Sequence, residues 1–102
     1  MEIDRRRMRA NIVLESQRRD AFLEDDWVGV TIAFGEGADA PAVSITARDE
    51  RCVMVNLDPD TGDQDARVMK AVVRMNGNYA GVYATVVRAG SIQVGQTVHL
   101  VR

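Results

Sequence analysis

Cys52 is the only cysteine of this 102-residue chain, and its surroundings suit a reactive thiol. Arg51 directly precedes it, and a cationic neighbour favours the thiolate, which is the nucleophile and the ligand for soft metals. The apolar run at 53–57 follows, so the sequence predicts a thiol between a strand and a turn. A structural role is the alternative, because free cysteine often packs as a small buried hydrophobe. A functional thiol predicts an accessible side chain that reacts with thiol reagents in the folded protein.

The turn after this run has the sequence Asp-Pro-Asp-Thr-Gly at 58–62. Proline presets one turn dihedral and glycine permits another. Shaping the turn is one role for the polar side chains Asp58 and Thr61. The charge cluster at 48–51, directly before the cysteine, predicts a solvated loop.

Basic residues gather at the start of the chain. Six of the thirteen lysine and arginine residues fall in the first nineteen positions: Arg5, Arg6, Arg7, Arg9, Arg18 and Arg19. Arginine suits planar, bidentate recognition of phosphate or carboxylate, although a GC-rich genome would produce the same bias. The sequence therefore predicts a local basic face, with a solvated leader segment as the alternative.

Four stretches, in matching order, resemble MOSC domains, which are related to the C-terminal part of molybdenum cofactor sulfurases and to amidoxime-reducing molybdenum enzymes. The Arg-Cys pair with the 58–62 turn resembles the family signature, and 7–13 resembles its Arg-Phe-Arg-Pro-Asn-Ile stretch. Residues 24–29 resemble its Glu-Asp-x-Trp-x-Gly, and 81–95 its closing strands. The part that usually precedes the first stretch has no counterpart. We therefore expect residues 1–102 to form a single, truncated MOSC-like domain, the C-terminal portion only.

The resemblance implies a module that binds molybdenum cofactor (molybdopterin) or carries sulfur for it as a persulfide. Cys52 would be the sulfur acceptor from a pyridoxal phosphate-dependent cysteine desulfurase, or a molybdenum ligand. The remaining residues that the resemblance assigns to the cofactor are Arg7, Arg9, Asn11, Arg51, Asp58 and Thr61. For Asn11 the alternative is a hydrogen bond to its own backbone. Whether the chain is part of a molybdenum-cofactor sulfurtransferase or of a molybdenum-dependent reductase system stays open.

A function of another class fits the same sequence, namely a non-catalytic truncated barrel that acts as an oligomerisation or accessory subunit. Missing opening strands would expose sheet edges, which proteins commonly protect by pairing under two-fold symmetry. We therefore expect a homodimer. The molybdenum and pterin content of the purified protein would separate the two functions.

The hydrophobic pattern predicts a mainly β fold with one α-helix, which the resemblance sharpens to a MOSC-like β-barrel or partial barrel. The helix is expected from Asp63, its N-cap, to Met75, and Asn76-Gly77 should end it. Trp27 is expected in the core, with stacking on a ligand as the alternative. Strands are expected at 11–14, 27–34, 43–47, 81–88, 91–94 and 97–101.

Composition excludes several classes of partner. The formal net charge of -2 gives no general attraction for nucleic acid or for an anionic membrane surface. No apolar run approaches the ~20 residues that a membrane helix needs. A single cysteine cannot form an internal disulfide, so the chain fits a reducing, cytoplasmic location. His99 alternates outward on its expected strand and does not by itself indicate a metal ligand.

Overall fold

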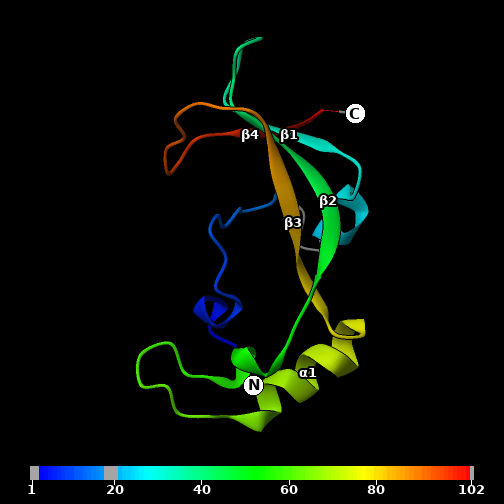
Figure 1. The fold of residues 1–102 in the computed structure, drawn as a ribbon, viewed down its shortest axis with the longest axis vertical. Helices are drawn as coiled ribbons and strands as arrows, with labels where there is room; N and C mark the ends of the chain where they lie inside the picture. Colours follow the sequence, from blue (N-terminus) through cyan, green and yellow to red (C-terminus); the bar gives the residue numbers. More distant parts are fainter. Residues whose placement is uncertain (1–2, 18–20, 102) are drawn as a thin grey trace. The chain divides into compact units, whose positions relative to one another are not determined.

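The computed structural model describes residues 3–17 and 21–101 and divides into two compact units (Figure 1). Unit 1 consists of Met1–Leu23 and Arg48–Gly81, and unit 2 consists of Glu24–Ala47 and Val82–Arg102. Two arginines of the predicted basic face, Arg18 and Arg19, lie outside the described residues.

One four-stranded sheet dominates the fold, with the strand order β3-β2-β1-β4 (Figure 1). Its strands are β1 (Thr31–Phe34), β2 (Ala42–Glu50), β3 (Tyr79–Arg88) and β4 (Val98–Val101). Strand β1 pairs antiparallel with β2 and with β4. The sheet is open, and it is joined by a single α-helix within the described residues. The prediction of a mainly β fold, in the form of a partial barrel with one helix, is therefore confirmed.

The core of unit 2 follows the predicted alternation along β1. Ile32 and Phe34 are buried while Thr31 and Ala33 are half-buried, because successive side chains of a strand point to opposite faces. From β2 and the turn before it come the buried residues Ala40, Ala42 and Ile45.

Strand β1 begins later than the sequence predicts. Residues Leu23–Trp27 form a short 3₁₀-helix, η2, and the Val30 N–H donates to the Trp27 carbonyl. Gly29 has a φ of 87°, which favours glycine and turns the chain before pairing starts. Trp27 is only half-buried, so its prediction as a core residue is wrong.

Unit 1 is built on α1 (Ala66–Asn76) and two 3₁₀-helices, η1 (Arg5–Met8) and η3 (Val53–Asn56). Asp65, not Asp63, is the N-cap of α1, and its carboxylate accepts from the Arg67 N–H. Gly77 ends the helix in the left-handed conformation, as predicted. The buried residues of this unit are Val55, Val68, Val72 and Ala80. None of the helices in the described segments has the length and apolar character needed to cross a membrane.

Two predicted strands do not form. Residues 11–14 are irregular, with Ile12 and Val13 exposed, and they belong to none of the strands of the described sheet. Residues 91–94 lead into a turn and expose Val94. The closing strand is confirmed as β4, on which Leu100 is exposed.

Candidate functional site

Unit 1 contains a pocket of about 370 Å³. Its walls come from the arginines of the η1 region, from η3 and from the turn at 58–62, and the lining residues are Arg6, Arg7, Arg9, Met54, Leu57, Asp58, Pro59 and Gly62. Its volume lies in the range of small-molecule sites, about 300–1,000 Å³. The pocket brings together Arg7, Arg9 and Asp58, three of the residues assigned to the cofactor from two separate stretches of sequence.

The short helix η1 and the residue that ends it carry the arginines that line this pocket. Asp4 caps its start by accepting the Arg6 N–H at 2.9 Å, and Arg9 ends it with φ 55° and ψ 36°. In a 3₁₀-helix, residues three apart lie on the same side. This spacing fits the presence of both Arg6 and Arg9 in one pocket.

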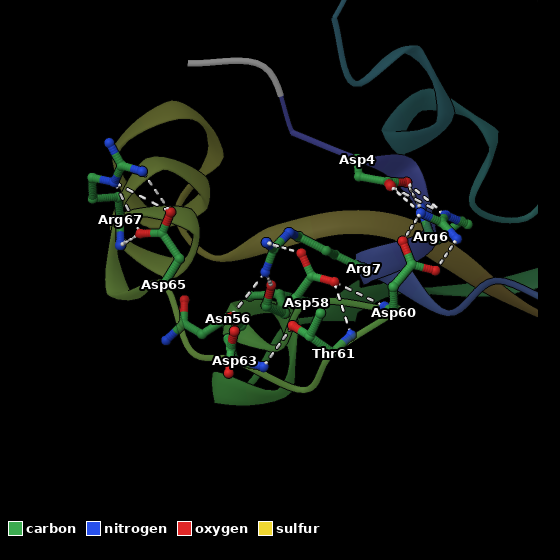
Figure 2. A network of polar contacts seen from close by, with 11 residues as sticks. Asp4, Arg6, Arg7, Asn56, Asp58, Asp60, Thr61, Asp63, Asp65 and Arg67 are labelled. Carbon is green, nitrogen blue, oxygen red and sulfur yellow. Dashed lines mark hydrogen bonds and ion pairs between the residues drawn. The ribbon is translucent and has the colours of Figure 1, made fainter.

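Arg7 donates hydrogen bonds to backbone carbonyls of the opposite wall. Its Nη1 donates to the Asn56 carbonyl at 2.9 Å and to the Val55 carbonyl at 3.4 Å, and its Nη2 lies 3.6 Å from Asp58 Oδ2 (Figure 2). Only 12 % of its side chain is exposed. The guanidinium therefore joins η1 to η3 and to the 58–62 turn, a role that its sequence position did not indicate.

Arg6 is held by two carboxylates at the surface. Its Nη1 and Nη2 each donate to one oxygen of Asp60 at 2.9 Å, while Nε and Nη2 contact Asp4 (Figure 2). Hydrogen bonds with Asp60 and Asp4 raise the pKa of Arg6, and the bond with Arg6 lowers the pKa of Asp4. The sequence analysis named Arg6 only as part of the basic face, because its link to Asp60 spans 54 positions.

Arg9 differs from both of its neighbours. Its side chain is exposed and lines the pocket. Across residues 3–17 and 21–101, its guanidinium has neither an ion-pair partner nor a hydrogen-bond acceptor. Arg9 is thus the pocket residue whose charge is open to a ligand.

The turn at 58–62 is fixed by its own side chains. Asp58 Oδ1 accepts the N–H groups of Asp60 at 2.8 Å and Thr61 at 3.1 Å (Figure 2), and these two bonds lower the pKa of Asp58. Thr61 Oγ1 accepts the Asp63 N–H at 3.2 Å, and Thr61 does not line the pocket. Gly62 has φ 78° and donates its N–H to the Asp58 carbonyl. Shaping the turn, the alternative role of both side chains, is therefore observed.

Asn56 is a site residue that the sequence analysis missed. Its Oδ1 accepts the Met69 N–H at 2.8 Å, and its carbonyl accepts the Asp65 N–H at 2.8 Å as well as Arg7. Asn56 therefore couples η3 to the first turn of α1. A polar residue at the end of the apolar run 53–57 was the only local signal.

Cys52 is exposed, as a functional thiol requires. It precedes η3 as its N-cap, without a capping hydrogen bond from its side chain. The alternative of a buried hydrophobe is therefore wrong. Met54, two residues further on, lines the pocket, whereas Cys52 is not among the described residues that do.

The Arg51 guanidinium was expected beside the thiol, but its contacts are with two backbone carbonyls and one carboxylate. Its Nε donates to the Ala80 carbonyl at 2.8 Å, its Nη1 to the Met8 carbonyl at 2.6 Å, and its Nη2 lies 3.1 Å from Asp49 Oδ2. A Cβ at Gly81 would lie 2.9 Å from Nη2, so glycine leaves room for the guanidinium. The predicted solvated loop at 48–51 is also wrong, because β2 continues through Glu50.

Two further candidates are not brought into the pocket. Asn11 is exposed in a bend and is not one of the lining residues. His99 is exposed on β4. In the part of the chain that the structure describes, no three His, Cys, Asp or Glu side chains are grouped so that they could hold a metal ion.

Comparison with known protein families gives a match. The family model described as MOSC domain matches residues 1–99, which is nearly the whole chain. Among the curated proteins, none matches the chain.

Proposed function

The chain belongs to the MOSC domain family, and from this premise we propose that its arginine-lined pocket binds molybdenum cofactor and that Cys52 serves the sulfur or metal chemistry of that cofactor. MOSC domains are associated with molybdenum cofactor and its sulfur chemistry. The observation that carries the proposal is the open charge of Arg9 in a pocket whose η3 wall follows directly on an exposed thiol.

The residues of the pocket fit the parts of a pterin cofactor. Arg9 would hold the phosphate, because a guanidinium binds phosphate through paired N–H donors. Met54, Leu57 and Pro59 supply apolar surface for a flat ring, and a small number of polar groups among apolar ones is typical of ligand sites. When bound, the cofactor would supply molybdenum-centred redox and sulfur chemistry. The chain itself would bind, orient and present a thiolate.

As a sulfur carrier, Cys52 would receive one sulfur atom from a donor persulfide. Its thiolate attacks the outer sulfur of the donor, a new S–S bond forms at Cys52 Sγ, and the donor leaves as its own thiolate. The exposure of Cys52 supports this use, because the attack needs access to the sulfur. We propose a cytoplasmic cysteine desulfurase as the donor. Ligation of molybdenum by the same thiolate is the other use of this site.

The test is the cofactor and sulfur content of the protein from a cofactor-competent host. Molybdenum by elemental analysis and pterin by fluorescence should both accompany the wild-type chain, and Arg9→Ala should lose most of each. Arg74→Ala, on the exposed side of α1, is the matched control and should retain both. After incubation with a desulfurase and free cysteine, the intact mass should rise by one sulfur atom in the wild type but not in Cys52→Ser.

The second candidate is an accessory subunit without catalysis, favoured by one observation about β3. This strand is an edge of the described sheet, and its residues 83–88 are exposed. It carries no charged residue or proline before Arg88, the devices with which proteins usually protect an edge. Wild-type protein without molybdenum, pterin or an acquired sulfur would favour this function over the first.

We propose that a second copy of the chain covers this edge, which gives a homodimer in either function. An antiparallel pairing of the two β3 strands centred on Thr85 would place Tyr83 opposite Val87 of the second copy. Aromatic and β-branched residues make favourable cross-strand pairs, and threonines can pair with each other. The two copies of Arg88 would lie at opposite ends, so like charges would not meet.

A further inference from the structure

We infer that Asp60 is a displaceable internal anion, which makes the pocket select a phosphate dianion over singly charged anions. The inference rests on the proposed function, since it concerns the phosphate group that the cofactor would present to this pocket. It starts from the different states of the three arginines that line the pocket.

Arg7 takes no direct part in anion binding. Its guanidinium is largely buried and is engaged by the carbonyls of Val55 and Asn56 and by Asp58 (Figure 2). Releasing it would leave these carbonyl groups without their donor, which costs free energy in a partly buried place. Arg7 is therefore a positioning residue that holds the two pocket walls together.

Arg9 and Arg6 are the two arginines that an anion can use. The Arg9 guanidinium can bind an anion without first losing a partner, because no described residue pairs with it. Arg6 is covered by Asp60, whose two carboxylate oxygens accept from Nη1 and Nη2 at 2.9 Å each. This is the arrangement with which a guanidinium also binds two oxygens of a phosphate.

The ion pair between Arg6 and Asp60 is weak. The side chain of Arg6 is 54 % exposed and that of Asp60 is 67 % exposed, and pairs of this kind contribute little to stability. When Asp60 leaves, Asp4 still accepts from Nε and Nη2 of Arg6, so the guanidinium keeps its orientation. Displacement of Asp60 thus exposes a second charge without freeing the side chain.

The charge of the incoming anion decides whether displacement is favourable. A phosphate carries about -1.5 to -2 charges and three acceptor oxygens, so it can replace both contacts of Asp60 and also serve Arg9. A small carboxylate carries one charge, and at Arg6 it would only replace another carboxylate. It gains contacts at Arg9 alone. The internal carboxylate therefore raises the charge that a ligand must bring.

The experiment is a titration of the full chain with inorganic phosphate and with acetate at constant ionic strength, followed by amide NMR shifts at 5–9 and 58–62. The wild type should bind phosphate about tenfold or more tightly than acetate, and more tightly as the pH rises and the second phosphate proton leaves. The variant Asp60→Asn leaves Arg6 open to acetate, which gains contacts that phosphate already makes in the wild type. The ratio of phosphate affinity to acetate affinity should therefore fall by about threefold or more. Arg9→Ala should weaken binding of both anions.

Arg67→Ala, a surface change away from the lining residues, serves as the control and should change neither affinity. Unchanged thermal midpoints of the variants would show that the pocket is intact. An unaltered phosphate-to-acetate ratio in Asp60→Asn would overturn the inference, and so would a wild type that binds neither anion. Cofactor content decides the proposed function separately, since a chain that holds molybdenum and pterin without the Asp60 effect would refute the selectivity alone.

Discussion

Units 1 and 2 are stabilised by different kinds of interaction. In unit 1, guanidinium groups of Arg7 and Arg51 reach across to backbone carbonyls of other elements, around a small apolar core. In unit 2, antiparallel pairing and alternate burial along β1 dominate. The pocket therefore lies where polar contacts determine the geometry, whereas the sheet is held together by apolar packing and strand pairing and has an open edge.

This contrast has a thermodynamic side. A buried guanidinium bonded to carbonyls is costly to remove because its acceptors stay behind without donors. An exposed apolar edge is instead costly to leave in water and favours association. Substitutions in unit 1 should therefore act on the stability of the single chain, and substitutions on β3 should act on assembly.

The largest effect is expected from Arg51→Ala. The side chain is only 12 % exposed, and its loss would leave the carbonyls of Met8 and Ala80 and the Asp49 carboxylate without their partner. We expect the free energy of unfolding to fall by about 3 kcal/mol. Urea denaturation followed by circular dichroism measures it. Arg67→Ala removes an arginine that is 76 % exposed and should change the free energy of unfolding far less.

Equal losses in Arg51→Ala and Arg67→Ala would contradict this assignment, because they would show that the buried links in unit 1 matter no more than a surface pair. Arg51→Lys sharpens the test. It keeps the charge but cannot reach two carbonyls and Asp49 with one planar group, so its stability should fall between that of the wild type and that of the alanine variant.

The next largest effect is expected on dimer formation, from Val86→Lys on β3. Val86 is 69 % exposed, and lysine on an edge strand opposes pairing with a second copy. We expect light scattering at micromolar concentration to give a dimer for the wild type and a dimer dissociation constant raised about tenfold or more for the variant. Val73→Lys, on the exposed part of α1, should leave the dimer intact. A monomeric wild type with cooperative unfolding would remove the support for the β3 interface.

The smallest effect is a pH dependence at the start of α1. Hydrogen bonds from the side chain and the backbone N–H of Arg67 lower the pKa of Asp65 from 3.8 to about 2. Since the folded-state pKa is the lower one, the carboxylate contributes stability that is present above 3.8 and is lost as the pH falls through about 2. Asp65→Asn keeps a capping side chain but does not titrate there. The urea midpoints of the two proteins should therefore converge as the pH falls, and a constant difference would refute the assignment.

The elements with strong local signals could be predicted from the sequence. Gly77 ends α1 because glycine adopts the left-handed conformation required there without strain, and the alternation of Ile32 and Phe34 marks a half-buried strand. The run at 11–14 carries an equally apolar pattern but forms no strand. Strand formation depends on which segments the fold brings side by side, and no local pattern specifies that.

The candidate site divides in the same way. The resemblance to MOSC domains pointed to Arg7, Arg9 and Asp58, and all three line the pocket. The separate roles of the arginines could not be predicted, because they depend on acceptors about fifty positions away, such as the Asn56 carbonyl and Asp60. Sequence patterns identify which charges are present, and only the folded chain decides which of them are neutralised.

The backbone of Arg9 has a consequence for how this protein balances folding against binding. The φ of Arg9, 55°, lies in the left-handed region. For residues other than glycine, asparagine and aspartate this conformation costs roughly 1–2 kcal/mol of stability. Asparagine at this position would relieve the strain, yet it would remove the open charge from the pocket. If Arg9 binds the ligand as we propose, arginine at this position gives up stability in exchange for ligand affinity, a trade-off that stabilised variants of natural proteins often reveal.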